Sequence, residues 1–204
     1  MPQKTSARSA ADGIARRNRL LNIPTRQVAA GPFERKSSVY LGLSALKEVC
    51  RTRGDCTLTV VSRYPEIRDA AQAVGAQAVD SPDSEKGQAY SIRAGLQALG
   101  RVGERDFILF LPADQPWITP QTISRLLDAA GPDTWTATAA FGERVGTPTL
   151  FSAQLLPDLM ALEGDRGGRK LMGRRENPAC HSDRVRAGTG RRGLPGTVTI
   201  AEKS

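Results

Sequence analysis

Apolar and polar positions alternate along the chain in two distinct ways. Short continuous apolar runs, which are typical of buried β-strands, lie at residues 58–61, 76–79, 107–111, 134–141 and 198–200. Between them, apolar residues recur every three or four positions, which predicts helices at 37–51, 65–74, 87–99, 120–129 and 153–162. Thr119 before Pro120 is a typical helix start, because the hydroxyl can cap the first turn. The alternation predicts an α/β fold, a Rossmann-like three-layer sandwich with a mostly parallel sheet.

One strand is expected at the centre of this sheet. Residues 107–111, FILFL, are apolar at every position, as a strand buried on both faces requires. Ligands of such sheets bind beyond the carboxyl ends of the strands, and Asp114 follows this strand within three residues. Its carboxylate, in a turn stiffened by Pro116, is well placed to hold Mg²⁺ against a triphosphate. A solvated turn aspartate is the alternative that the residue alone leaves open.

The amino-acid composition excludes several classes of protein and several kinds of catalytic site. A chain of 204 residues with 39% hydrophobic and 25% charged residues is typical of one globular domain. No apolar run approaches the roughly 20 residues that span a bilayer, and the first residues lack a signal-peptide core, so we expect a cytoplasmic protein that does not contact a membrane. Three cysteines without paired spacing and a single histidine, His181, favour neither a disulfide framework nor a zinc site nor a histidine triad. The chemistry must therefore depend on carboxylates, basic side chains and backbone amides.

The net charge of +8 is unevenly distributed. Residues 1–53 contain 11 Lys/Arg and 3 Asp/Glu, residues 54–163 contain 8 and 14, and residues 164–204 contain 10 and 4. Basic ends around an acidic middle suit a site for polyanionic small molecules, and a strip that tracks DNA is the alternative. Aromatic residues make up only 5% of the chain, which does not favour base stacking. We therefore expect phosphorylated small molecules as ligands, and no sequence-specific nucleic-acid partner.

Four segments of the chain resemble motifs of one family, in the family's order. LFLPADQPWIT at 109–119 resembles the strand and (G/A)DQP turn of MobA/MocA-like nucleotidyltransferases, most closely the molybdenum cofactor cytidylyltransferase branch. SPDSEKG at 81–87 followed by SIRAGL at 91–96 is similar to its NP-x-x-x-x-G…S-[IL]-R-x-G-L segment. GTPTLF at 146–151 is similar to its G-x-P-x-x-F strand, and GDRGGR at 164–169 to its G-D-[KR]-G-[AG]-[RK] loop. The resemblance covers roughly residues 10–175 and implies the fold of nucleotide-diphospho-sugar transferases.

The resemblance implies a nucleotidyltransferase that joins CMP from CTP to a phosphorylated acceptor, molybdopterin, with release of pyrophosphate. Mg²⁺ would be the cofactor, with Asp114 as its ligand, and a molybdenum hydroxylase apoenzyme would be a further partner. The residues that the resemblance places in contact with the nucleotide are Ala11, Gly13, Ser81, Gly87, Ser91 and Asp114. Those that it places beside the acceptor, an anionic pterin, are Gly146, Pro148, Asp165, Arg166, Gly167 and Arg169. Arg17 and Arg19 would be catalytic together with Asp114, because they would neutralise the β- and γ-phosphates.

The phosphate-binding loop of the family has the form A-A-G-x-S-x-R-x-G-x-x-K-L-L and follows the first strand. Its best counterpart is AADGIARRNRLL at residues 10–21, which has an extra Asp before Gly13, lacks the second glycine and carries Arg19 in place of lysine. If the loop lies at residues 10–21, the first strand is expected at residues 5–10. A rival placement uses AAG at residues 29–31. Near the carboxyl terminus, GTVT at 196–199 replaces the family's D-[IV]-D-T and contains no acid.

These observations indicate a nucleotidyltransferase-like domain that spans residues 1–187. A Gly/Arg-rich segment follows at 188–204 and ends in a candidate edge strand. Two other classes of protein remain open. The altered loop and the missing acids favour a catalytically silent nucleotide- or cofactor-binding relative. The charge alone favours a nucleic-acid-binding protein.

Overall fold

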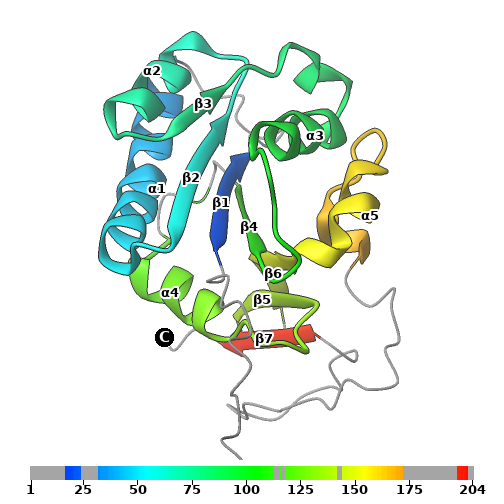
Figure 1. Cartoon of the computed structure of the whole chain (residues 1–204). Coiled ribbons are helices and arrows are strands. Elements are labelled where there is room, and N and C mark those ends of the chain that lie inside the picture. Colours follow the sequence, from blue (N-terminus) through cyan, green and yellow to red (C-terminus); the bar gives the residue numbers. More distant parts are fainter. Residues whose placement is uncertain are drawn as a thin grey trace, which may run out of the picture.

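The fold is built on one seven-stranded sheet, drawn in Figure 1. The computed structural model describes residues 17–23, 32–112, 115, 118–141, 144–171 and 197–201. Across the sheet the strands follow the order β3-β2-β1-β4-β6-β5-β7. Their bounds are β1 (Asn18–Ile23), β2 (Cys56–Val61), β3 (Gln77–Val79), β4 (Phe107–Pro112), β5 (Thr136–Phe141), β6 (Arg144–Ser152) and β7 (Thr197–Ala201). β6 runs antiparallel to its neighbours β4 and β5 and all other pairs are parallel, so the mostly parallel sheet is confirmed.

Helices cover both faces of the sheet, as Figure 1 shows. α1 (Pro32–Arg53), α2 (Pro65–Ala73) and α4 (Pro120–Asp128) pack on one face, and α3 (Gln88–Ala98) and α5 (Leu156–Met160) pack on the other. Successive strand residues point to opposite faces; Leu20 of β1 therefore packs with the first group of helices and Leu21 with the second. The three-layer α/β sandwich expected from the sequence is confirmed. None of the helices in the described ranges has the length and apolar character needed to cross a bilayer.

Most elements expected from the hydrophobic pattern are present. The apolar runs correspond to β2, β3, β4, β5 and β7, and the first four helical stretches correspond to α1, α2, α3 and α4. Thr119 caps α4, because its hydroxyl oxygen accepts a hydrogen bond from the backbone N–H of Thr122 at 3.2 Å. The single helix expected at 153–162 is instead a 3₁₀ turn, Ala153–Leu155, followed by the short α5. Pro157 near the start of α5 has no N–H to continue a helix that began at Ala153, which accounts for the break.

Strand β1 occupies part of the segment in which the sequence suggested a phosphate-binding loop. Residues 18–21 of the expected loop lie inside this strand, where every residue is buried, so the placement is wrong for these four residues. The strand pairs with β2 on one side and with β4 on the other. The strand expected at 5–10 and the expected loop residues Ala11 and Gly13 lie outside the described residues.

The amino ends of β1 and β4 are joined by a buried polar network around Asp106. This carboxylate, 4% exposed, accepts hydrogen bonds from the backbone N–H groups of Arg17 at 2.9 Å and Gly103 at 3.0 Å. The guanidinium of Arg19 lies 3.7 Å from the same carboxylate and donates to the carbonyl of Arg101 at 3.0 Å. Arg17 and Arg19 therefore belong to the amino edge of the sheet, opposite the edge at which such sheets bind ligands. This placement corrects the catalytic role expected for them.

β7 pairs in parallel with β5 and lies at the edge of the sheet. It includes residues 198–200, in which the sequence suggested a strand. The expected domain boundary at residues 187–188 lies outside the described residues.

Candidate functional site

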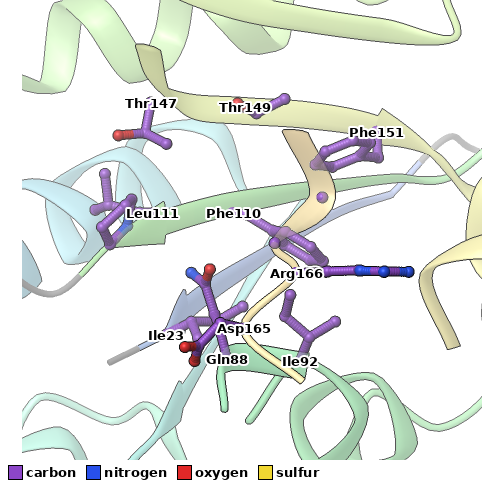
Figure 2. Close-up of a pocket in the computed structure, with 13 residues that line it drawn as sticks. Ile23, Gln88, Ile92, Phe110, Leu111, Thr147, Thr149, Phe151, Asp165 and Arg166 are labelled. Atoms are coloured by element: carbon purple, nitrogen blue, oxygen red, sulfur yellow. The ribbon is translucent and has the colours of Figure 1, made fainter. Parts of the chain in front are cut away.

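A cavity of about 460 Å³ lies at the carboxyl ends of strands β1 and β4 (Figure 2). Ile23 and Pro112, the last residues of these two strands, line the cavity and are neighbours in the parallel register. β6, the start of α3 and residues 165–168 complete the wall. The carboxyl edge is where α/β sheets of this kind bind ligands, and the volume is that of a small-molecule site. The cavity is therefore the candidate functional site.

Much of the cavity wall is apolar and aromatic. The rings of Phe110 and Phe151 lie with their centroids 5.0 Å apart and their planes tilted by 53°. Ile23 and Ile92 add aliphatic surface. The polar lining residues are Gln88, Thr147, Thr149, Asp165 and Arg166. A wall of this composition suits a flat, partly apolar ligand with charged or hydrogen-bonding substituents.

Three of the six residues expected beside an acceptor line this cavity: Asp165, Arg166 and Gly167. Pro148 is buried in β6, directly after the lining residue Thr147. Gly146 also lies in β6, and Arg169 lies in the 3₁₀ turn Gly168–Leu171. The segments that carry these residues therefore meet at one place, although their contact with an acceptor stays a prediction.

Gly87 lies where the start of α3 meets the loop that carries Asp165. Its φ is +134°, and a side-chain carbon there would lie 2.4 Å from the carbonyl carbon and oxygen of Gly164. The same carbonyl accepts a hydrogen bond from the backbone N–H of Ala89 at 3.0 Å. Only glycine can occupy position 87 in this packing. The structure thus gives Gly87 a packing role, and its expected contact with a nucleotide stays a prediction.

Ser81 and Ser91 face each other inside the protein. Their exposed fractions are 2% and 1%, and their hydroxyl oxygens lie 3.3 Å apart in a mutual hydrogen bond. The bond ties the residue before the 3₁₀ turn Pro82–Lys86 to the first turns of α3. The structure thus gives both serines a packing role, because their hydroxyls are buried and bonded to each other, and their expected contact with a nucleotide stays a prediction.

The 3₁₀ turn Pro82–Lys86 precedes α3 and carries charged side chains in pairs. Arg63, after β2, forms an ion pair with Glu85. Lys86 lies 2.7 Å from the carboxylate of Asp83, and this hydrogen bond raises the pKa of Lys86 above its ordinary value. The ammonium group also lies 5.9 Å from the centroid of the Tyr90 ring. Such exposed pairs orient the turn and contribute little to stability.

Gln115 connects the segment after β4 to strand β6. Its side-chain amide donates to the hydroxyl of Thr147 at 2.5 Å and to the backbone carbonyl of the same residue at 3.2 Å. Its Oε1 atom is buried and has no hydrogen-bond partner in the part of the chain that the structure describes. No role for Gln115 is expected from the sequence, although the residue stands in the DQP motif next to Asp114. Asp114 itself lies outside the described residues, and among those described no three acidic, cysteine or histidine side chains gather into a metal site.

Comparison with known sequences gives one family. Residues 35–179, most of the chain, match the model of the MobA-like NTP transferase domain. The purine catabolism protein PucB of Bacillus subtilis (strain 168) is 33% identical over 90 residues, which are 44% of this chain and 42% of PucB. The chain thus matches less than half of that relative's length.

Solved structures share the fold over nearly the whole chain. Rv0371c from Mycobacterium tuberculosis H37Rv is 22% identical with a TM-score of 0.59, covering 92% of this chain and 89% of that one. Rv0371C in complex with manganese is 25% identical with a TM-score of 0.56 and the same coverage. A 4-diphosphocytidyl-2C-methyl-D-erythritol synthase is 19% identical with a TM-score of 0.57, covering 79% of this chain and 87% of that one. On the strength of the match over residues 35–179, this chain belongs to the MobA-like NTP transferase family.

Proposed function

We propose that this protein transfers a cytidylyl group from CTP to a phosphorylated acceptor of pterin type, molybdopterin, with Mg²⁺ as its cofactor. An oxygen of the acceptor's terminal phosphate attacks the α-phosphorus of CTP, and the bond from that phosphorus to the bridging β-phosphate oxygen breaks. The products are a pyrophosphate-linked dinucleotide and free pyrophosphate. A molybdenum hydroxylase apoenzyme would receive the dinucleotide. Membership of an NTP transferase family supports the class of reaction, whereas CTP, the pterin and the metal are part of the proposal.

The observation that carries the proposal is the cavity at the carboxyl ends of β1 and β4. Parallel α/β sheets bind nucleotides at this edge. Residues from the GTPTLF segment at 146–151, the SIRAGL segment at 91–96 and the GDRGGR segment at 164–169 line its wall. The fourth segment that resembles a family motif, at 109–119, includes the lining residues Phe110, Leu111 and Pro112. Four segments singled out for their sequence thus meet around one small-molecule cavity.

The composition of the wall supports a heterocyclic, anionic acceptor. The rings of Phe110 and Phe151 and the aliphatic side chain of Ile92 provide apolar surface for a flat ring system. Arg166 provides a cation, and a guanidinium can bind phosphate through two parallel hydrogen bonds. Little covalent chemistry is required of the protein, which would act by positioning the two phosphorylated substrates and stabilising charge.

Asp114 is the proposed ligand of Mg²⁺. It stands two positions after Pro112, the last residue of β4 and part of the cavity wall. Protein sites for Mg²⁺ often use one or two carboxylates, with water and substrate phosphates as the other ligands, so a single aspartate at this edge fits the ion. Two buried amide oxygens near the ends of β1 and β4, Asn22 Oδ1 and Gln115 Oε1, have no hydrogen-bond partner among the described residues, although neither residue lines the cavity. When bound, Mg²⁺ would neutralise negative charge on the phosphates.

The chain order supports a phosphate-binding loop at residues 24–31. These residues follow the carboxyl end of β1 and precede α1, which begins at Pro32. They contain the AAG segment at 29–31, the rival placement, and they lie outside the described residues. The N–H groups at the start of a helix suit the charge of a triphosphate. Arg17 and Arg19 are not part of this proposal, because they lie at the amino edge of the sheet.

Thermal-shift measurements with CTP, GTP, ATP and UTP, each with and without Mg²⁺, test the proposal. CTP with Mg²⁺ should stabilise the protein most, and Asp114→Asn should lose the Mg²⁺-dependent part of that stabilisation, because a carboxylate that joins the metal to the phosphates is removed. Equal or tighter binding of GTP with Mg²⁺ would overturn the preference for cytosine. An unchanged Mg²⁺ effect in Asp114→Asn would make this residue a turn residue only.

A catalytically silent nucleotide-binding relative is the second candidate. The observation that favours it is the start of the family match at residue 35, which leaves residues 24–31 outside the matched range. Release of pyrophosphate from CTP in the presence of molybdopterin separates the two candidates. Binding of CTP without pyrophosphate release would favour the silent relative.

A further inference from the structure

Residues 165–168, called the wall segment below, form part of the cavity wall (Figure 2). A side-chain carbon at Gly167 would lie 2.6 Å from Oε1 of Gln88, the first residue of α3. A side-chain carbon at Gly168 would lie 2.6 Å from the ring of Phe151 in β6. Contacts this close prevent the wall segment from moving toward α3 or β6. Its place in the wall therefore depends on what prevents it from moving away.

Arg93 holds the chain just ahead of the wall segment. Its Nη1 atom donates a hydrogen bond of 2.6 Å to the backbone carbonyl of Leu162, three residues before Asp165. Arg93 lies in the middle of α3, which packs beside α5 (Figure 1). The side chain of Leu162 is buried in the same apolar cluster as the buried face of α3. The bond thus ties the turn that leads into the wall segment to a helix that is fixed in the core.

The ring of Tyr90 orients the guanidinium of Arg93. Residues three positions apart on a helix lie on the same face, and the central carbon of the guanidinium lies 4.5 Å from the ring centroid. An aromatic face attracts a cation, and a planar guanidinium stacks on it. This stacking restricts the movement of the guanidinium, so that less entropy is lost when it bonds to the carbonyl of Leu162.

The two arginines near the cavity have different roles in this arrangement. Arg93 belongs to the SIRAGL segment but lies outside the cavity lining, because its hydrogen bond directs the guanidinium to the main chain. Arg166 is an exposed residue of the wall segment and lines the cavity. A guanidinium in a cavity wall can bind a phosphate, whereas one bonded to a carbonyl can act only on the chain that it holds.

We propose that Arg93 is a positioning residue that holds Arg166 and the rest of the wall segment in place for binding of the phosphorylated acceptor. The inference rests on the proposed function, in which Arg166 provides the cation for the acceptor's phosphate. Without the bond to Leu162, only a fraction of the molecules would have the wall segment in the binding position. The apparent dissociation constant rises in inverse proportion to that fraction, and loss of a hydrogen bond from a charged group can change it about 10-fold.

The test combines two measurements on each variant. Hydrogen–deuterium exchange of residues 163–168 reports opening of the wall segment, since the N–H of Arg166 is bonded to the carbonyl of Glu163 at 3.2 Å. Titrations measure the dissociation constants of molybdopterin and of CTP with Mg²⁺. In Arg93→Met, exchange should become about 10-fold faster and the dissociation constant of molybdopterin should rise about 10-fold. That of CTP should stay at the parent's value.

Three further variants test the contact itself. Arg93→Lys can still donate to the carbonyl of Leu162 and should restore part of the affinity for molybdopterin. Tyr90→Leu removes the ring and should lose part of it. Arg68→Met is the matched control, because Arg68 of α2 also donates to a backbone carbonyl, that of Ser62 at 2.9 Å, but lies outside the cavity lining. It should equal the parent in both measurements.

A double variant shows whether Arg93 acts through Arg166. Arg166→Ala alone should weaken the binding of molybdopterin. Adding Arg93→Met to it should have a much smaller effect than in the parent, because the side chain that the bond holds in place is gone. An equal effect of Arg93→Met in both backgrounds would overturn the inference.

The outcomes separate this inference from the proposed function. If Arg166→Ala weakens molybdopterin binding and Arg93→Met does not, the positioning role is overturned and the proposed acceptor site stands. Unchanged exchange at 163–168 in Arg93→Met also overturns it. Equal losses for molybdopterin and CTP in Arg93→Met would show a merely structural role, which again overturns the inference. If the parent protein does not bind molybdopterin, the acceptor of the proposed function is wrong, and the inference fails with it.

Discussion

The stability of strand β1 should depend on the carboxylate of Asp106. In the folded protein this carboxylate accepts two backbone hydrogen bonds, from Arg17 at 2.9 Å and from Gly103 at 3.0 Å. It also lies 3.7 Å from the guanidinium of Arg19, with the two side chains 6% and 10% exposed. Asp106→Ala leaves two N–H groups without this acceptor and a buried cation without its counter-charge.

The expected loss of stability follows from these contacts. Removing one partner of a buried ion pair costs about 3–5 kcal/mol, and a hydrogen bond to a charged group is worth about 1.5–3 kcal/mol. The two costs overlap, and Arg19 keeps hydrogen bonds to the carbonyl of Arg101 and the hydroxyl of Thr57. We expect Asp106→Ala to lower the free energy of unfolding by about 4 kcal/mol and the melting temperature by about 10 °C. Asp106→Asn, which keeps one carbonyl oxygen, should lose about 2 kcal/mol.

Urea unfolding followed by circular dichroism measures these differences. The double variant Asp106→Ala with Arg19→Met should be more stable than the sum of the single losses predicts, because it removes the unpaired cation. A loss below about 1 kcal/mol in Asp106→Ala would refute the reasoning. Arg19→Met should also leave the dissociation constant of CTP unchanged. Weaker CTP binding at unchanged stability would instead return Arg19 to a phosphate-binding role.

Two other features give predictions. Gly87→Ala should lower the free energy of unfolding by about 3 kcal/mol or more, because the new carbon would lie 2.4 Å from the carbonyl of Gly164. Gly54→Ala, at φ +70° with open space around it, is the control in the same urea titration and should lose only about 1 kcal/mol, so equal losses would contradict the close approach. Cys50 should react with iodoacetamide faster than Cys56 at pH 8, because contact with the Cys56 thiol lowers the pKa of Cys50, whereas the Cys50 thiol raises the pKa of Cys56. Peptide mass spectrometry measures both rates; Cys56→Ala should slow the reaction of Cys50, and equal rates at the two thiols would contradict the assignment.

The elements that could be predicted from the sequence are those whose burial is visible in local pattern. β4 is apolar at its first five positions because helices cover both of its faces, and it was expected where it lies. β1 is equally buried but contains Asn18, Arg19 and Asn22. Asn18 donates to the carboxylate of Asp55 at 2.8 Å, and Arg19 pairs with Asp106. Hydrogen bonds and ion pairs with residues distant along the chain allow these polar residues to be buried inside a strand. A local sequence pattern does not show such distant partners, so β1 could not be predicted from it.

The error in β1 led directly to the error in the phosphate-binding loop. The polar residues of β1 hide a strand at 18–23, so the motif match at 10–21 predicts a loop that includes Arg17 and Arg19, with its strand at 5–10. The spacing between a strand and the following helix is a better guide, since ligand-binding loops in these folds connect the two. Residues 24–31 meet that condition between β1 and α1.

The hydrogen bonds between Gln115 and Thr147 could not be predicted from the sequence either. The reason here is the order of the strands in the sheet. Strands that follow one another in the chain usually pair, and that tendency would place β5 next to β4. Here β6 reverses direction and inserts between them, so that residues 32 positions apart in the chain come within hydrogen-bond distance. The sequence placed both segments in motifs of one family but did not indicate that they touch. Sequence motifs thus identify which segments belong to a site, whereas the strand order decides which of their side chains can support one another.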